Sequence, residues 1–432
     1  MRPITYEKQN NGVIRVGGVG LKALASEYGT PLYVMDYQTI LDRMAGYQSA
    51  LSDWGSAYYA SKALCCRAIL ELVKHQGWGV DVVSGGELYT AFQAGFDARA
   101  ILFHGNAKSL SEIRTGLQAG VGHFVVDSLD ELERLDEEAR RQEVMASVLI
   151  RITPGIAAHT HEFIRTGEFD SKFGFATEGG RADEAVNLAL SLSSVRLSGF
   201  HAHIGSQILD AEPFLASAQA LLMFSTALYE RTGFWPQVLD IGGGLGVTYQ
   251  TQDRAPTPQE VLGPVSRWMV ENTPKGLKPP RIWVEPGRSI VADAGFTLYR
   301  VDSVKTTPTG RTYVTVDGGM GDNVRPALYG AEYAGELDEK PEGLQSRTVA
   351  VAGRYCESGD VLMGSVELKD PKAGDLLVVW TTGAYAYSMA STYNRVPRPA
   401  MVMVRAGQAS IWVERETWGD LVQHDQPLVL RD

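Results

Sequence analysis

The chain has few cysteines and no run of basic residues. Its 432 residues include three cysteines, Cys65, Cys66 and Cys356, whose number and spacing suit neither a disulfide framework nor a zinc site. The 40 lysines and arginines are scattered and outnumbered by 51 aspartates and glutamates, which gives a net charge of −11. These features argue against a disulfide-stabilised secreted domain and against a nucleic-acid partner.

Long apolar stretches are missing as well. The N-terminal sequence MRPITYEKQNNG contains neither an apolar core nor a small-residue cleavage site, so we expect no signal peptide. No uninterrupted apolar run approaches the ~20 residues that a membrane helix needs. Together with the sparse cysteines, this predicts a cytoplasmic protein that has no membrane partner.

Between residues 36 and 292, short apolar runs alternate with amphipathic segments. Eight of the runs have the composition of buried strands. They are SAYYAS (56–61), GVDVVS (79–84), AILFHG (100–105), HFVVDS (123–128), SVLIRI (147–152), LSGFHAHI (197–204), QVLDIG (237–242) and RIWVE (281–285). Eight strand–helix units over about 250 residues predict a (β/α)8 barrel. A doubly wound sheet is the alternative, but its first turn would be expected to carry a glycine fingerprint where this chain has Lys62.

The sequence changes character after Pro286. The runs TYVTVDGG, RTVAVAG, DLLVVWTTGAY and PAMVMVRAGQASIWVE are β-branched and are separated by glycine, proline and charged residues, which predicts an antiparallel β domain. NGVIRVGG near the N-terminus has the same character. We therefore predict an α/β chain with a TIM-type barrel over 36–292 and a second, sandwich- or barrel-like β domain formed by 1–35 and 293–432.

Polar side chains follow the predicted barrel strands, at the C-terminal face where such barrels hold their active sites. The first run leads into Lys62, the second contains Asp81, and the last ends in EPGR with Glu285 and Arg288. After the seventh run, GGGLG (242–246) lets backbone N–H groups approach phosphate oxygens. A lysine, a carboxylate for a pyridine nitrogen and a phosphate site are what pyridoxal phosphate requires. Each feature alone would also fit a surface lysine, an ion pair or a tight turn.

Two histidine pairs keep a metal site open as an alternative. His201 and His203 alternate along the sixth run and therefore face the same side, and His159 and His161 form a second pair in a predicted loop. With Asp81 as a further ligand, the first pair would fit a metal-dependent hydrolase on a barrel. In the cofactor interpretation, the ring of His203 instead stacks on the pyridine.

Three polar, glycine-bearing segments of the second domain are candidates for loops at a site. They are VDGGMGDNVRPALYGA (316–331), RYCESGDVL (354–362) and TTGAYAYSMASTYNRVPRP (381–399). Cys356 lies in sequence typical of a loop. A buried cysteine is usually inert, whereas a loop thiol close to cationic groups can ionise and transfer protons.

Taken together, these motifs resemble the bacterial diaminopimelate decarboxylases, which are fold-type III pyridoxal-phosphate enzymes. The matching pieces occur in the family's order along almost the whole chain: YASKA, WGVDVVSGGEL, HGNAKS, SKFG, GFHAHIGSQ, DIGGGLG, EPGRSIV, DGGMGDNVRPALYGA, CESGD and GAYAYSMASTYN. The chain departs from residues common in the family at Leu64, Ala107 and Gly321, the last standing where the family commonly has asparagine. The resemblance implies decarboxylation of meso-2,6-diaminopimelate to L-lysine and CO₂, the last step of bacterial lysine biosynthesis. It also implies a homodimer whose active sites lie at the subunit boundary.

The resemblance further implies roles for individual residues. Lys62 would carry pyridoxal 5'-phosphate covalently, and Cys356 would return a proton after CO₂ leaves, with Lys62 as the alternative donor. The implied cofactor-binding residues are Lys62, Asp81, His203, Ser206, Gly243, Gly244, Glu285, Gly287, Arg288 and Tyr385. The implied substrate-binding residues are Arg288, Arg325, Tyr329, Glu357 and Tyr385. The loop that contains Cys356 and Glu357 would reach into the active site from the second subunit.

Other members of this fold act on ornithine, arginine or carboxynorspermidine. Enzymes of the ornithine type typically have an aspartate after the loop cysteine, whereas this chain has Glu357. Together with Arg288 and Arg325, that glutamate favours a substrate with a distal carboxylate. A non-catalytic relative would be expected to lack the lysine or the loop cysteine, and both are present.

Overall fold

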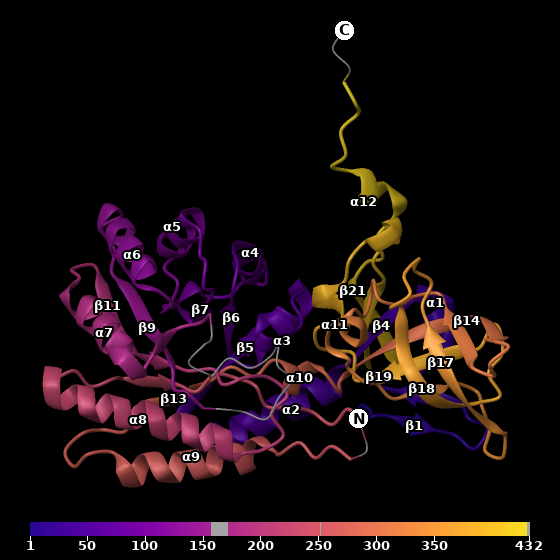
Figure 1. The fold of residues 1–432 in the computed structure, drawn as a ribbon, viewed down its shortest axis with the longest axis horizontal. Helices are drawn as coiled ribbons and strands as arrows, with labels where there is room; N and C mark the ends of the chain where they lie inside the picture. The colour runs from indigo at the N-terminus through magenta and orange to yellow at the C-terminus, as the bar shows by residue number, and fades with distance from the viewer. Residues whose placement is uncertain (157–171, 251, 430–432) are drawn as a thin grey trace. The chain divides into compact units, whose positions relative to one another are not determined.

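The computed structural model describes residues 1–156, 172–250 and 252–429 (Figure 1). The chain divides into two compact units. The barrel unit consists of Asp42–Val247 and Asp253–Ile290, and the β unit consists of Met1–Leu41, Thr248–Gln252 and Val291–Asp432. None of the helices in the described ranges combines the length and the apolar character that crossing a bilayer requires.

The barrel unit contains eight parallel strands that close into a ring. Their order is β9-β11-β12-β13-β5-β6-β7-β8, and β8 pairs with β9 to complete the circle. The strands are β5 (Gly55–Ala60), β6 (Gly79–Val82), β7 (Ile101–Phe103), β8 (His123–Val126), β9 (Ala146–Thr153), β11 (Val195–His201), β12 (Val238–Asp240) and β13 (Arg281–Val284). A short strand, β10 (Phe175–Ala176), adds to β9. The predicted TIM-type barrel is therefore confirmed, with one strand for each predicted run.

Helices cover the outside of this ring (Figure 1). They are α3 (Arg67–His75), α4 (Gly85–Gln93), α5 (Leu110–Ala119), α6 (Leu129–Arg141), α7 (Arg181–Ser191), α8 (Glu212–Thr232) and α9 (Pro258–Asn272), with α2 (Tyr37–Leu51) before the first barrel strand and α10 (Arg288–Val291) after the last. A hydroxyl N-cap starts four of them: Ser84, Ser109, Ser128 and Thr257 each accept a hydrogen bond from the backbone N–H three residues on. Such caps satisfy N–H groups that the first turn leaves free, and they fix the residue at which each helix begins.

The interior of the barrel is apolar away from the mouth. Leu102, Val125, Leu149, Val238 and Trp283 form a buried cluster on five different strands. Parallel strands that are covered by helices bury both faces, so their inward residues fill the ring. The polar residues that end the same strands are thereby confined to the C-terminal mouth.

The β unit is built around one long strand. β14 (Gly295–Thr306) pairs through its first half with β4 (Leu32–Asp36) and β19 (Leu376–Trp380), and through its second half with β15 (Thr312–Val316). The other strands are β16 (Gly335–Leu337), β17 (Ser346–Ala352), β18 (Val361–Lys369), β20 (Ala400–Arg405) and β21 (Gln408–Val413), beside a small sheet of β1 (Glu7–Lys8), β2 (Ile14–Val16) and β3 (Val19–Gly20). Its helices are α1 (Leu21–Tyr28), α11 (Arg325–Tyr329) and α12 (Trp418–Val422).

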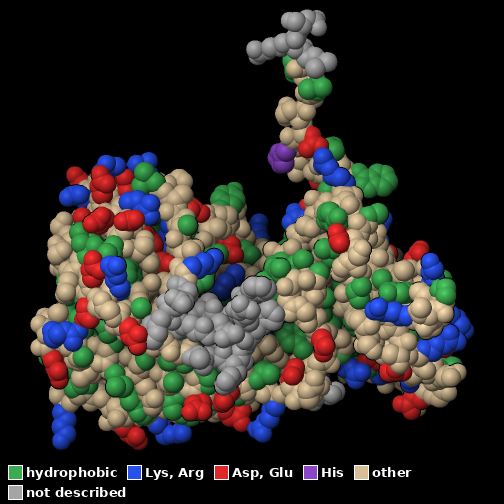
Figure 2. Space-filling view, viewed as in Figure 1, with side chains coloured by type: hydrophobic (Ala, Val, Ile, Leu, Met, Phe, Trp, Pro, Cys, Tyr) green, Lys and Arg blue, Asp and Glu red, His purple; other side chains and the backbone are tan. Residues whose placement is uncertain are grey.

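Most strand pairs of the β unit are antiparallel, as predicted, but two are parallel. These are β15 with β17 and β4 with β20. Neither pair is joined by a hairpin, so the chain direction imposes no antiparallel arrangement on them. On the face shown in Figure 2, lysines and arginines are interspersed with aspartates and glutamates over both units, without a basic patch.

Candidate active site

Lys62 lies in a short 3-10 turn directly after β5, at the C-terminal mouth of the barrel. Its Nζ donates a hydrogen bond of 2.5 Å to Oδ2 of Asp81, which lies on the neighbouring strand β6. Asp81 is fully buried, whereas 36% of the Lys62 side chain is exposed. A buried carboxylate therefore anchors the amine of a side chain that is only partly exposed, which distinguishes Lys62 from an ordinary surface lysine.

Glu285 follows β13 and is contacted by two histidines. Oε2 of Glu285 lies 3.3 Å from Nε2 of His201, the last residue of β11. Oε1 lies 2.6 Å from Nε2 of His104, which follows β7. All three side chains are buried. Burial raises the pKa of Glu285, but the two histidines outweigh it and hold that pKa well below its usual range, so the carboxylate is ionised.

The His201 ring is neutral at physiological pH, because burial lowers its pKa to about 4. A carboxylate can only accept hydrogen bonds, so a neutral ring beside Glu285 carries its proton on Nε2. The rings of His104 and His201 meet edge to face, with 4.9 Å between their centroids.

The ligands of the alternative metal site do not form one cluster in the structure. Within the described residues, the groups with ligand-like spacing are His104, His201 and Glu285, whose atoms lie within 4.8 Å of one another, rather than His201 with His203 and Asp81. The 2.6 Å between His104 and Glu285 is shorter than the roughly 3.3 Å that separates two ligands on one tetrahedral zinc ion. His159 and His161 lie outside the described residues.

The segment GGGLG follows β12 and leaves no room for a side chain at Gly243 or Gly244. A Cβ on Gly243 would lie 2.1 Å from the carbonyl oxygen of Glu285. At Gly244, where φ is +111°, it would lie 2.3 Å from the carbonyl oxygen of Gly205. Nη2 of Arg288 donates a 3.0 Å hydrogen bond to Oγ of Ser206. The loops after β11, β12 and β13 thus bring together a hydroxyl, a glycine backbone and a guanidinium, a donor set suited to a phosphate.

These residues fit pyridoxal phosphate. Oε1 of Glu285 is buried and lacks an aligned hydrogen bond, although His104 lies close to it, so it can accept one from a pyridine N–H. The ring of His203 adds a flat surface. This ring is neutral, because burial and the nearby charges of Lys62 and Arg151 hold its pKa well below the usual range. The amine of Lys62 and the donors around Ser206 supply the other two contacts that the cofactor needs.

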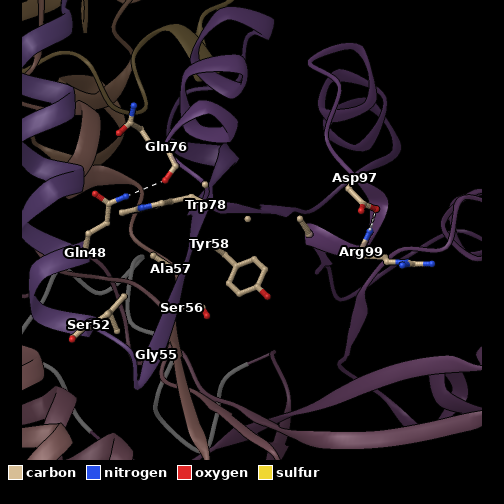
Figure 3. A pocket seen from close by; sticks show the side chains of 14 residues that line it. Gln48, Ser52, Gly55, Ser56, Ala57, Tyr58, Gln76, Trp78, Asp97 and Arg99 are labelled. Carbon is tan, nitrogen blue, oxygen red and sulfur yellow. Dashed lines mark hydrogen bonds between the residues drawn. The ribbon is translucent and has the colours of Figure 1, made fainter.

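A cavity of about 490 Å³ lies at the opposite end of the barrel (Figure 3). Tyr58 and Trp78 line it together with Asp97 and Arg99. Gln48 and Gln76 line it too, and Nε2 of Gln48 donates to the backbone oxygen of Gln76. These residues lie where β5, β6 and β7 begin. In a parallel barrel that end serves stability and the other end serves catalysis, so this cavity is separate from the candidate active site.

In the β unit, Arg325 is the first residue of α11 and is buried. Its Nη1 donates to the hydroxyls of Tyr249 at 3.1 Å and Tyr333 at 2.5 Å, and its guanidinium carbon lies 6.0 Å from the ring centre of Tyr329. Among the described residues, no carboxylate forms an ion pair with Arg325. A buried guanidinium surrounded by tyrosines is suited to binding a carboxylate that comes from a ligand.

Cys356 and Glu357 are exposed, as expected of a loop. The backbone N–H of Cys356 donates to Oδ1 of Asn394 at 3.0 Å. In contrast, burial raises the pKa of Cys65 to about 12 and that of Cys66 to about 11, which makes both thiols inert at neutral pH. The backbone of Tyr385 adopts a left-handed φ of +60°, a conformation that non-glycine residues rarely adopt outside functional sites and turns.

Gly321 leaves space for the ring of Tyr355, which precedes Cys356. A Cβ on Gly321 would lie 2.1 Å from Oη and 2.4 Å from Cζ of Tyr355. The ring is held in place by stacking on Tyr393, with 5.9 Å between centroids. Any side chain at 321 would displace this ring, which accounts for glycine at a position where the family commonly has asparagine.

We expect Gly321→Ala to destabilise the protein by about 1–3 kcal/mol, the usual cost of overpacking, measured by urea denaturation. Combining it with Tyr355→Ala should cost less than the two single changes added together, because the space that the ring leaves accepts the new methyl group. Gly364→Ala is the control, since a Cβ there meets nothing within 4 Å. Additive single costs would contradict the proposed clash.

The carboxyl group of Asp322, in the loop before Arg325, is expected to make the stability of the protein depend on pH. Its carboxylate accepts hydrogen bonds from Tyr299 and from the Gly319 N–H, and burial raises its pKa from 3.8 to about 7. The native state therefore gains stability from this proton below pH 4 and loses it as pH rises through 7. Relative to Asp322→Asn, the wild type should lose about 2–3 kcal/mol between pH 5 and 8 in urea denaturation. Asp302→Asn, at an exposed site, should track the wild type, and parallel curves for all three would contradict the assignment.

Three groups at the barrel mouth received no role from the sequence. Besides His104, these are Arg151, whose Nη1 lies 3.5 Å from Oδ1 of Asp127, and Asp240, whose Oδ1 accepts from the N–H of Gly242 at 2.8 Å. Burial, and then the charge of Glu285, raise the pKa of Asp240 well above its usual range, so this acid is neutral. Their positions near the ends of predicted strands could have marked them as candidate site residues. Residue type alone did not distinguish them from polar groups with a structural role.

The comparisons with known proteins agree with this geometry. Residues 37–292 match the family described as "Pyridoxal-dependent decarboxylase, pyridoxal binding domain". The chain is 45% identical to the diaminopimelate decarboxylase of Halalkalibacterium halodurans, over 98% of both chains. It is 44% identical to that of Bacillus subtilis, over 98% of this chain and 97% of the relative.

A solved structure gives the same result. The crystal structure of diaminopimelate decarboxylase from M. jannaschii in complex with L-lysine has a TM-score of 0.93 and 36% identity, and 99% of each chain is covered. The barrel and its site thus define the class of pyridoxal-dependent decarboxylases. Within that class, the chain belongs to the diaminopimelate decarboxylase family, and it is a carboxy-lyase.

Proposed function

We propose that the chain decarboxylates meso-2,6-diaminopimelate to L-lysine and CO₂, with pyridoxal 5'-phosphate as cofactor, in the cytoplasm. The observation that carries this is the joint presence of Lys62, the ionised Glu285 and the glycine loop after β12 at one barrel mouth. The barrel domain over 36–292 binds the cofactor in this proposal, and the β domain formed by 1–35 and 293–432 contributes the substrate loops.

When bound, pyridoxal phosphate accepts the electron pair that remains on the substrate carbon after CO₂ leaves. Lys62 binds the cofactor covalently, while Asp81 directs its side chain toward the mouth. Glu285 holds a proton on the pyridine nitrogen, and the ring of His203 supports one face of the pyridine. Ser206, Gly243, Gly244, Gly287 and Arg288, with Tyr385, bind the phosphate.

The far end of the substrate is an amino acid group, and it is recognised by charge. Arg325 and Tyr329, with Arg288, bind its carboxylate, while Glu357 binds its ammonium and Tyr385 completes the site. Cys356 returns a proton to the reacting carbon. Cys356 and Glu357 are exposed on their own unit. As the resemblance to diaminopimelate decarboxylases implies, we place them in the active site of a second copy, in a homodimer.

A visible absorption spectrum of the purified protein tests this proposal, recorded with released CO₂ before and after addition of meso-2,6-diaminopimelate. We expect a band from the covalently bound cofactor, and CO₂ release. A band without release would redirect the substrate assignment to ornithine, arginine or carboxynorspermidine. No band after incubation with pyridoxal phosphate would overturn the cofactor assignment.

A further inference from the structure

The carboxylate of Glu285 lies between two histidine rings. His201 is neutral, and its Nε2 lies 3.3 Å from one carboxylate oxygen while Nε2 of His104 lies 2.6 Å from the other. A carboxylate that is buried without hydrogen bonds costs several kcal/mol. His104 and His201 are therefore placed to hold the carboxylate of Glu285 inside the barrel.

Two further polar groups that act on Glu285 are Asp240, which shares a hydrogen bond with it, and His203. Asp240 on β12 is neutral, and His203 after β11 is neutral. The charges that act on this cluster from neighbouring strands are Asp81 and Lys62, which pair with each other, and Arg151, whose nearest carboxylate is Asp127. In the described part of the chain, no lysine or arginine forms an ion pair with Glu285.

A lysine or arginine in place of the histidines would neutralise the carboxylate and weaken its attraction for a protonated ring nitrogen. Histidine nitrogens at 2.6 Å and 3.3 Å instead fix the direction of the two oxygens. The same logic applies to groups that orient metal ligands without contacting the substrate.

We propose that His104, together with His201, is a positioning residue for the cofactor's ring nitrogen: the two rings hold the Glu285 carboxylate in the orientation that a pyridine N–H requires. The inference rests on the proposed function, since it concerns pyridoxal phosphate. In this role His104 acts through its atom Nε2, and the volume of its ring matters less.

Two variants separate the donor atom from the ring. His104→Gln keeps an N–H near the position of Nε2 but removes the ring, whereas His104→Phe keeps a ring against His201 but has no donor. A structural role predicts that phenylalanine is tolerated better. The positioning role predicts the reverse order.

The readout is the Kd of the cofactor-free protein for pyridoxal phosphate and for its 1-deaza analogue, in which a C–H replaces the ring nitrogen. We expect His104→Phe to weaken binding of pyridoxal phosphate by about tenfold or more and to leave the affinity for the analogue nearly unchanged. His104→Gln should stay close to the wild type for both compounds. His123→Gln is the control, because His123 starts β8 at the other end of the barrel and packs on Trp283.

Equal weakening of both compounds in His104→Phe would overturn the inference, as would unchanged affinity for both. If His104→Phe fails to fold, the order in His201→Phe and His201→Gln decides in the same way. A wild type that binds pyridoxal phosphate no better than the analogue would instead contradict the role of Glu285. A wild type that binds neither would contradict the proposed function itself.

Discussion

Replacing Lys62 by alanine is expected to abolish the visible band of the bound cofactor and to lower kcat by on the order of 10⁴-fold. Lys62 is the amine that the barrel presents at its mouth, held at 2.5 Å from the buried Asp81. Without it, the cofactor loses its covalent anchor, and the reaction loses the group that takes the cofactor back from the product. The measurements are the absorption spectrum and the initial rate of CO₂ release.

Lys108 provides the matched control in the same barrel. Its Nζ donates to the carbonyl oxygens of Gly105 and Val125 at 2.8 Å each and to Glu131 at 2.6 Å. All three protons of its ammonium are therefore used within the protein, so Lys108 has a structural role. Lys108→Met should lower stability, because it leaves a buried Glu131 unpaired, but the folded fraction should retain the cofactor band. A normal band in Lys62→Ala, or its loss from folded Lys108→Met, would contradict these assignments.

The sequence predicted the barrel and most of its mouth because both follow from local patterns. Apolar runs mark buried strands, and parallel strands place their C-terminal ends together, so Lys62, Asp81 and Glu285 were expected to converge. Contacts between side chains on different strands do not follow from such local patterns. Which oxygen of Glu285 faces His104, and that His104 rather than His203 completes the cluster with His201, depends on side-chain directions across the ring.

Two further features could not be predicted from local sequence patterns, for the same reason. Gly321 and Tyr355 are 34 positions apart, and nothing in either motif shows that a ring fills the place of a side chain. The parallel pairing of β4 with β20 joins segments from opposite ends of the chain. Hydrophobic alternation identifies both strands, but it contains no information about which strand becomes the neighbour or in which direction.

Replacing Arg325 by methionine is expected to lower kcat/KM for meso-2,6-diaminopimelate by roughly 10³- to 10⁴-fold, while the cofactor band remains. The guanidinium is buried and bonded to Tyr249 and Tyr333, so methionine keeps much of the volume and removes the charge that meets the distal carboxylate. Arg325→Lys should recover only part of the loss, because an ammonium cannot form the paired hydrogen bonds of a guanidinium.

The same substitution should also change what the site rejects. L-Lysine bound with its amino acid group at the reaction centre has no distal carboxylate, so the buried charge of Arg325 would lack a carboxylate to pair with. A site built for such a group discriminates strongly against the analogue that lacks it. In Arg325→Met, the ratio of kcat/KM for meso-2,6-diaminopimelate over L-lysine should therefore narrow. Arg398→Met is the control: Arg398 pairs with Glu416 and 41% of its side chain is exposed, so both values should stay near the wild type. An unchanged ratio in Arg325→Met would show that another group reads the distal carboxylate, and Arg288 would be the first to examine.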